Sequence, residues 1–281
     1  MRWPPDQQTW PLARYSRQIL CRPHRWHVQE HGAGDTILLI HGAGGATQSF
    51  RNLFPLLAQN HHVIAVDLPG QGFTQCGAQH RCGLDHMAQD LVALCRHENW
   101  EPALIVGHSA GVPIALRMWE LGVRPLRGIV GINAALGTFK GVAGWLFPMM
   151  AKVLAATPFS ARIFAATTTR NSVRTLIQGT GSTLDEAGID LYYRLATDRA
   201  HVDATLAMMA QWSLDGLLAR LGRIDAPVHL ITGLGDKSVP PQTSRDAAAL
   251  LANARLTELP HLGHLAHEED AATIAALITA T

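Results

Sequence analysis

Residues 103–111 read Ala-Leu-Ile-Val-Gly-His-Ser-Ala-Gly, and this stretch decides the fold class of the chain. The apolar run 103–106 predicts a buried strand, and the residues from Ser109 to Leu121 have helical periodicity. Between them, residues 107–111 match the pattern G-x-S-x-G, which requires a strand before it and a helix after it. The glycines allow a strained turn, since a Cβ at either position would collide where helix and strand pass closely. The stretch therefore predicts a strand–turn–helix unit with Ser109 in the turn.

Ser109 is a candidate nucleophile, because the turn places its hydroxyl at a helix N-terminus, where free N–H groups favour negative charge. A serine nucleophile needs a base, and the base needs an acid to orient it. In this setting they follow the serine in the order Ser, Asp, His. We expect the acid to be Asp236, which comes just after the predicted strand 228–231. Asp67 precedes the nucleophile, so we interpret it as structural support for the nucleophile loop.

The base is expected in the loop after the last predicted strand, 255–258, where three histidines compete. We favour His264, because it follows Gly263 at the mouth of the final helix. His267 lies one turn further on and is expected to pack or to cap. The spacing of His261, His264 and His267 could suggest a metal face, but no carboxylate or thiolate spacing supports one. We therefore expect neither a metal nor a cofactor.

A second glycine-rich turn directly follows the predicted strand 36–40 and reads Ile40-His41-Gly42-Ala43-Gly44-Gly45. Such a turn leaves backbone N–H groups unpaired and pointing into a site. We expect the N–H groups of Ala110 and Ala43 to form an oxyanion hole beside the serine. The alternative is a plain turn between a strand and a helix.

The chain alternates short β-branched runs with helical periodicity, which is typical of a mostly parallel sheet flanked by helices. Strands are predicted at residues 26–29, 36–40, 62–66, 103–106, 128–132, 228–231 and 255–258. The alternation fails over 137–215, where helical signals accumulate and residues 183–186 have the pattern of a capping box. We therefore divide the chain into a first core part at 1–136 with an N-terminal extension at 1–25, an all-helical lid at 137–215, and a second core part at 216–281.

Methionine and aromatic side chains are frequent in the predicted lid. Our candidates for contact with a substrate are Trp145, Phe147, Met150, Met209 and Trp212. Such side chains can line a large and adaptable apolar pocket. The same composition is equally expected of a packed lid core.

The composition is that of a globular protein of 281 residues, 47% hydrophobic and 16% charged. The net charge is +1 without a basic cluster, which argues against capture of nucleic acid. The four cysteines form no C-x-x-C pair, so we expect free thiols in a reducing cytoplasm. Residues 1–10 lack the apolar run of a signal peptide, and the most apolar stretch, 142–156, is too short to span a bilayer. We expect a cytoplasmic protein without a transmembrane segment, for which peripheral membrane contact stays open.

Taken together, these motifs resemble the α/β-hydrolase superfamily from about Trp26 onward. They are His41-Gly42, Asp67-Leu68-Pro69-Gly70, Gly107-His108-Ser109-Ala110-Gly111, Asp236 and Gly263-His264. The resemblance implies an α/β-hydrolase fold, with a mostly parallel eight-stranded sheet flanked by helices and an all-helical lid after the sixth strand. It also implies a serine hydrolase with a nucleophile elbow at Ser109. Because the nucleophile is serine and not aspartate, dehalogenase and epoxide-hydrolase chemistry is disfavoured.

Further stretches resemble one subfamily more narrowly. They are Arg25-Trp26-His27-Val28-Gln29, Asp67-Leu68-Pro69-Gly70-Gln71-Gly72-Phe73-Thr74, Gly131-Ile132-Asn133-Ala134-Ala135-Leu136 and Gly179-Thr180-Gly181-Ser182. Its members accompany bacteriochlorophyll-synthesis genes in phototrophic bacteria and are called magnesium chelatase accessory proteins. The resemblance implies a hydrolase that acts on an apolar ester or acyl substrate, such as a tetrapyrrole, in photosynthetic pigment synthesis, with a contact to magnesium chelatase. The alternative is a non-catalytic protein that binds or delivers a porphyrin for magnesium chelation.

Overall fold

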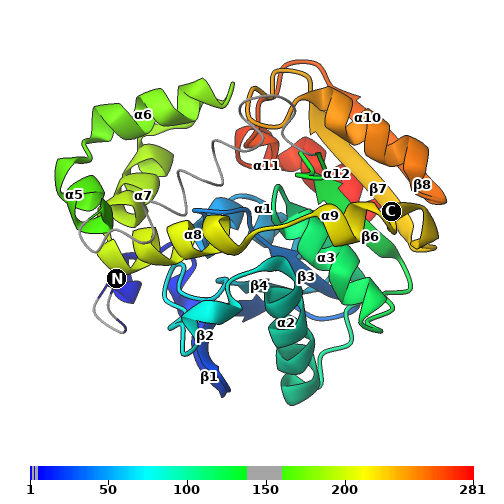
Figure 1. Cartoon of the computed structure of the whole chain (residues 1–281), viewed down its shortest axis with the longest axis horizontal. Coiled ribbons are helices and arrows are strands. Elements are labelled where there is room, and N and C mark those ends of the chain that lie inside the picture. Colours follow the sequence, from blue (N-terminus) through cyan, green and yellow to red (C-terminus); the bar gives the residue numbers. More distant parts are fainter. Residues whose placement is uncertain (2, 4–5, 138–159) are drawn as a thin grey trace.

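The computed structural model describes residues 1, 3, 6–137 and 160–281, which form a sheet of eight strands flanked by helices (Figure 1). The strands are β1 (Ser16–Cys21), β2 (His24–His31), β3 (Thr36–Ile40), β4 (His62–Val66), β5 (Leu104–His108), β6 (Gly128–Ile132), β7 (Pro227–Gly233) and β8 (Asn253–Leu259). Their order across the sheet is β1-β2-β4-β3-β5-β6-β7-β8. The first two are antiparallel to their neighbours, and all pairs from β4 to β8 are parallel. The mostly parallel sheet confirms the predicted fold class.

Helices pack against both faces of this sheet. On one face lie α2 (Leu84–Glu98), α3 (Gly111–Glu120) and α10 (Pro241–Leu250), and on the other lie α1 (Leu53–Leu57) and α12 (Ala271–Thr279). Alternate side chains of a central strand therefore enter two different apolar cores. In β3, Leu38 and Ile40 join the core under α2 and α3, while Ile37 and Leu39 join the core under α1 and α12. This double burial explains why the central strands read as continuous apolar runs.

Between β6 and β7 the described residues form helices and no strand. The helices are α5 (Ser160–Thr167), α6 (Arg170–Gly179), α7 (Glu186–Thr197), α8 (Arg199–Gln211) and α9 (Asp215–Leu218). Figure 1 shows α5 to α8 grouped beside the sheet as a separate helical layer. This confirms the predicted helical lid after the sixth strand.

The N-terminal extension contributes a strand that the sequence pattern did not predict. Strand β1 pairs with β2 in a tight hairpin, in which Cys21 lies opposite His24. Of the six residues in β1, only Ile19 and Cys21 are buried. An edge strand with so few buried side chains has little hydrophobic pattern to reveal it.

Two predicted helix ends differ in the structure. The capping box predicted at 183–186 is wrong, because α7 begins at Glu186 and its N-cap is Asp185, which accepts a hydrogen bond from Gly188 N. The final helix, predicted to run on from His264, is divided into α11 (Ala266–Glu269) and α12. It is interrupted at Asp270, whose carboxylate caps α12 by accepting from Thr273 N.

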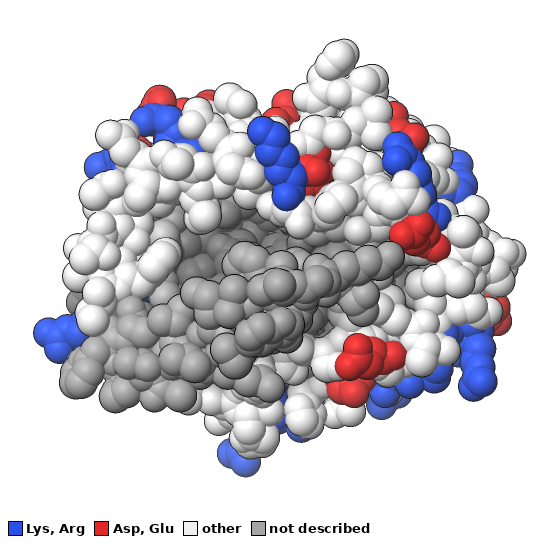
Figure 2. Space-filling view, turned by 45° about the horizontal axis from the view of Figure 1, so that its top comes forward, with Lys and Arg blue, Asp and Glu red and all other residues white. Residues whose placement is uncertain are grey.

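The surface carries charges of both signs. Figure 2 shows Lys and Arg side chains interspersed with Asp and Glu side chains around one face of the molecule. In the described part of the chain, no helix has the length and apolar character needed to cross a membrane.

Asp67, directly after β4, is a fully buried carboxylate that joins three parts of the chain. It accepts hydrogen bonds from Thr47 N at 2.7 Å, Phe73 N at 2.8 Å and the His27 ring at 2.6 Å. Burial by itself would raise the pKa of this carboxyl, but the charge and hydrogen bond of His27 outweigh it and hold the pKa below its usual value. The contacts support its interpretation as a structural residue.

We predict that Asp67→Asn lowers the free energy of unfolding by about 3 kcal/mol at neutral pH, because a buried pair loses one charged partner. Since the folded-state pKa is depressed, the carboxylate stabilises the fold above the unfolded-state pKa of about 4 and loses this contribution as the pH falls below it. The difference in free energy of unfolding between wild type and variant should therefore become smaller as the pH falls from about 5 to 3, as measured by urea unfolding.

Asp85→Asn is the matched control, because Asp85 pairs with Arg117 at the surface with its side chain 66% exposed. This substitution should lower the free energy of unfolding by no more than about 1 kcal/mol. Equal costs for the two variants would contradict the role given to Asp67.

Candidate active site

The turn between β5 and α3 places Ser109 in a left-handed conformation, with φ of 50°. A Cβ on Gly107 would lie 2.6 Å from the backbone of Gly111, and a Cβ on Gly111 would lie 2.2 Å from the Ile40 carbonyl oxygen. Both positions therefore require glycine. Ser109 N donates to Ile132 O at 2.9 Å, which ties the turn to the end of β6. The backbone strain at Ser109 is held by packing on two neighbouring strands.

The structure brings Asp236 and His264 to this serine. His264 Nε2 lies 3.1 Å from Ser109 Oγ, and His264 Nδ1 lies 2.8 Å from Asp236 Oδ2. A carboxylate only accepts hydrogen bonds, so Nδ1 is the donor to Asp236 and Nε2 faces the serine hydroxyl. The three side chains form one continuous chain of hydrogen bonds.

The carboxylate of Asp236 is held on both oxygens. Its Oδ1 accepts from Ser238 N and Val239 N, each at 2.8 Å, and its Oδ2 also accepts from Asn133 Nδ2 at 2.6 Å. Asn133 follows β6 with φ of 48° and is fully buried. No role at the site was predicted for Asn133. A polar residue directly after a parallel strand was the available signal, because such strand ends meet at one edge of the sheet.

The turn after β3 passes directly against the nucleophile. A Cβ on Gly42 would lie 2.9 Å from Ser109 Cβ, so only glycine allows this approach. Ala43 is exposed, and Ala110 is the N-cap of α3. Among the described residues, neither the backbone N–H of Ala43 nor that of Ala110 donates a hydrogen bond. Two free donors therefore belong to the turns that meet at Ser109.

Buried side chains fix this loop. The ring of His41 donates from Nδ1 to Gly42 O at 2.7 Å and accepts at Nε2 from Leu68 N at 2.9 Å. Burial lowers the pKa of His41, so the ring is neutral and can accept as well as donate. Gly44 N is bound by Gln71 Oε1 at 2.9 Å, which leaves it unavailable to a substrate.

Helix α8 of the lid docks on the same loops. His201 donates from Nε2 to Gly44 O at 3.2 Å and accepts at Nδ1 from Gly72 N at 3.1 Å. Burial lowers the pKa of His201 to about 4, so this ring is also neutral. A Cβ on Gly70 would lie 2.5 Å from Ala204 Cβ, which shows how closely the helix approaches.

The other two candidate histidines do not reach the serine. His261 is exposed, whereas His267 is fully buried and packs against His108, with ring centroids 4.4 Å apart. Burial lowers the pKa of His267 to about 3 and takes the pKa of His108 well below its usual value. His108 Nε2 donates to His264 O at 2.9 Å. Two neutral rings thus support the backbone of His264 without adding positive charge beside it.

A residue from the lid also holds the His264 loop. Ser182 Oγ accepts from Leu265 N at 2.8 Å and donates to Glu269 Oε2 at 3.0 Å, while the same carboxylate oxygen accepts from Gly263 N at 2.8 Å. Both neighbours of His264 are therefore bound. No contact with the His264 loop was predicted for Ser182 or Glu269, since the bond between them joins segments 87 residues apart in the chain.

The predicted substrate contacts are only partly within the described residues. Trp145, Phe147 and Met150 lie outside them. Met209 on α8 is 39% exposed, and Trp212 is partly buried against the core under α2 and α3. Among the described residues, no group of three or more His, Cys, Asp or Glu side chains could hold a metal ion.

Comparison with known proteins places the chain in a family. The family of the alpha/beta hydrolase fold matches residues 35–271, and the chain belongs to it. Within the family, the chain is 44% identical to the Magnesium-chelatase 30 kDa subunit of Rhodobacter capsulatus, over 96% of this chain and 95% of that protein. The predicted superfamily is thus confirmed, and the chain is similar to a magnesium-chelatase subunit.

More distant relatives include enzymes. The chain is 27% identical to 2-hydroxymuconate semialdehyde hydrolase of Pseudomonas sp. (strain CF600), over 93% of this chain and 92% of that protein. The solved structure of an alpha/beta hydrolase fold protein from Burkholderia ambifaria superposes with a TM-score of 0.79 at 21% identity, over 95% of this chain and 98% of that one. At this identity the structure shows the fold alone.

We predict that Gly111→Ala lowers the free energy of unfolding by about 2 kcal/mol or more, because the new methyl group meets the Ile40 carbonyl and neither backbone can retreat. Gly179→Ala is the control, since Gly179 ends α6 with no atom within 4 Å of a Cβ at that position. It should leave stability unchanged or raise it by about 0.5 kcal/mol. Urea unfolding measures both, and a Gly111→Ala protein as stable as wild type would exclude the close approach described.

Proposed function

We propose that the protein is a serine hydrolase in which Ser109 attacks an acyl carbon, His264 takes and returns the proton, and Asp236 orients the imidazole. The observation that carries the proposal is the continuous hydrogen-bond chain from Ser109 Oγ through His264 to Asp236, with links of 3.1 and 2.8 Å. A serine hydroxyl is a weak nucleophile until an adjacent base removes its proton. The ring of His264, whose Nε2 faces Ser109 Oγ, is arranged to do this.

Charge that develops on the substrate oxygen needs donors on the other side of the reacting carbon. The N–H groups of Ala43 and Ala110 fit this role, because both lie in the turns that meet at Ser109 and neither is bound by a described acceptor. The loss of one such donor typically costs about 3–4 kcal/mol of transition-state stabilisation. The carbonyl carbon would then be attacked, the ester oxygen would leave with the proton from His264, and water would release the acyl group.

The proposed substrate is an apolar ester or acyl compound, and the proposed setting is tetrapyrrole metabolism in the cytoplasm, as in bacteriochlorophyll synthesis. The support is the similarity to a magnesium-chelatase subunit over nearly the whole chain. Met209, Trp212 and the aromatic residues Trp145 and Phe147 are proposed to line the pocket with Met150. We also propose a contact with magnesium chelatase.

A second candidate function is favoured by one specific observation. The 44%-identical relative is named as a subunit of a chelatase and not as a hydrolase. A protein that binds or delivers a porphyrin for magnesium insertion would use the same pocket and leave the three side chains idle, since a fold and a site do not by themselves fix a function.

We expect a fluorophosphonate probe to label wild-type protein at Ser109 and not to label Ser109→Ala. Ester hydrolysis should fall about 10⁴-fold or more in the variant, because the nucleophile is lost. Ser238→Ala is the matched control, since its exposed side chain is not part of the hydrogen-bond chain and only its backbone contacts Asp236. Peptide mapping by mass spectrometry locates the label. Equal labelling of wild type and Ser109→Ala would exclude the hydrolase mechanism.

We expect protoporphyrin monomethyl ester to slow this labelling several-fold, because a tetrapyrrole in the proposed pocket covers the serine. Tryptophan fluorescence quenching measures its binding in parallel. Binding that leaves the labelling rate unchanged, and that is equally tight in Ser109→Ala, would favour the delivery function. Absence of binding would exclude both roles in tetrapyrrole metabolism.

A further inference from the structure

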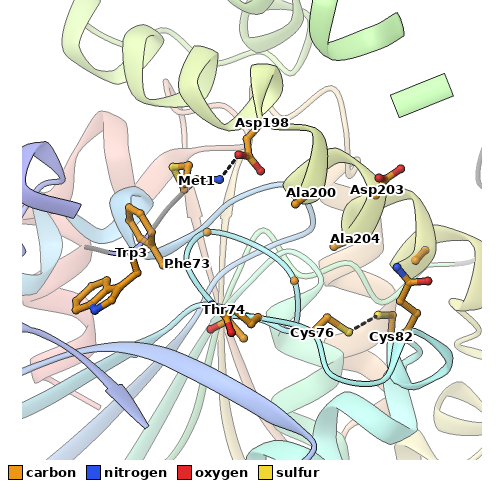
Figure 3. Close-up of a pocket in the computed structure, with 15 residues that line it drawn as sticks. Met1, Trp3, Phe73, Thr74, Cys76, Cys82, Asp198, Ala200, Asp203 and Ala204 are labelled. Atoms are coloured by element: carbon orange, nitrogen blue, oxygen red, sulfur yellow. Dashed lines mark hydrogen bonds and ion pairs between the residues drawn. The ribbon is translucent and has the colours of Figure 1, made fainter. Parts of the chain in front are cut away.

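A pair of thiols lies in the segment between β4 and α2, away from the three side chains around Ser109. The Sγ atoms of Cys76 and Cys82 are 3.9 Å apart and share a hydrogen bond, drawn as a dashed line in Figure 3. Both line a cavity of about 310 Å³ together with Gly70, Phe73 and Ala204. Neither Ser109 nor His264 is among the described residues that line this cavity. The cavity therefore gives solutes a separate route to the thiols.

The surroundings of Cys76 can stabilise a thiolate. His24, fully buried on β2, lies next to the Cys76 segment: its Nε2 lies 3.1 Å from Asp90 Oδ2, and its Nδ1 accepts from Gly77 N at 3.3 Å. Asp90 is held in turn by Arg81, whose Nη2 lies 2.6 Å from Asp90 Oδ1. Burial lowers the pKa of His24, but the hydrogen bond to Asp90 and the charges of Asp90 and Cys76 outweigh it and raise the pKa overall. A histidine near a sulfur favours the thiolate whenever its ring carries a positive charge.

The two thiols are unequal. The hydrogen bond from Cys82 lowers the pKa of Cys76 to about 4, against the opposing effect of burial and with further help from His24. The same hydrogen bond, together with burial, raises the pKa of Cys82 far above its usual value. Cys76 is partly exposed, whereas Cys82, which also lines the cavity, is fully buried. One sulfur is therefore a reachable thiolate, and the other is a protonated thiol within reach of it.

Other charged groups face this cavity. Asp198 and Asp203, from the start and first turns of α8, line it, and the N-terminal ammonium of Met1 pairs with Asp198.

The remaining cysteines differ from this pair: burial raises the pKa of Cys21, and it raises the pKa of Cys95 to about 12. Oxidation should consequently be selective for the pair.

We propose that Cys76 and Cys82 form a peroxide-reactive dithiol site that closes to an intramolecular disulfide. The Cys76 thiolate attacks one oxygen of hydrogen peroxide, the O–O bond breaks, and hydroxide leaves, so that Cys76 becomes a sulfenic acid. The Cys82 sulfur then attacks the Cys76 sulfur, and its proton leaves with the hydroxyl group as water. The two sulfurs together lose two electrons and the peroxide gains them.

The geometry permits the second step. A disulfide requires an S–S distance of about 2.05 Å, so the two sulfurs, now 3.9 Å apart, must move closer by about 2 Å. The five residues between the cysteines include the short helix Gln79–Arg81, which lies at the surface and has no buried residue. This site acts independently of the proposed hydrolysis at Ser109.

The first test is the pH profile of alkylation by iodoacetamide, read by peptide mapping on wild-type protein. Between pH 6 and pH 8 the rate at an ordinary thiol rises about 50- to 100-fold with its thiolate fraction. We expect the rate at Cys76 to change less than about two-fold over this range, because it is already ionised. His24→Gln should restore a steep profile. A steep profile for Cys76 in wild type would overturn the proposal.

The second test is treatment with one equivalent of hydrogen peroxide. We expect the intact mass to fall by two hydrogen atoms, both Cys76 and Cys82 to become resistant to alkylation, and dithiothreitol to reverse the change. Cys82→Ser should stop at a sulfenic acid on Cys76 that dimedone traps, and Cys95→Ala should behave as wild type. A disulfide between two molecules, or oxidation of Cys76→Ser at the wild-type rate, would overturn the proposal. Fluorophosphonate labelling of Ser109 is a separate measurement, so the two proposals fail independently.

Discussion

The site depends on one steric constraint, which is the backbone contact between the first turn of α3 and the end of β3. Gly111 packs so closely on the Ile40 carbonyl that no side chain fits between them. This contact fixes the angle at which α3 leaves the sheet and forces Ser109 into a left-handed conformation. The same approach brings the turn after β3 against the serine, where Gly42 is required for the same reason. Nucleophile and donor loop are thus positioned by one packing contact.

Short sequence motifs made the serine turn and its two partner side chains predictable. A glycine on each side of a serine, between an apolar run and a helical pattern, is a local signal that records the steric constraint directly. Asp236 and His264 could be assigned because each follows a late parallel strand, and the carboxyl ends of parallel strands meet at one edge of the sheet. Their geometry in the structure agrees with that assignment, with 2.8 Å between His264 Nδ1 and Asp236 Oδ2.

What the sequence did not reveal depends on contacts between distant segments. Asn133 and Ser182 each bind a partner more than 80 residues away, so no periodicity or spacing marks them. Strand β1 has few buried side chains and therefore little pattern, since its neighbour β2 supplies most of the burial at this edge of the sheet. The start of α7 was misplaced because Thr183, which looks like a helix cap, gives its N–H to Glu269 instead. In each of these places, contacts between segments far apart in the chain determine the structure, and local sequence patterns do not.

The distance along the chain between Ser109 and His264, 155 residues, has a consequence for protein synthesis. The turn that holds the serine has all its neighbours once β6 has emerged from the ribosome, whereas β8 and the loop with His264 emerge much later. A nascent chain can therefore present a strained serine turn but no base to activate it. Any chemistry at this serine therefore begins only after the loop with His264 has been synthesised, which protects a nascent chain from reacting with its surroundings.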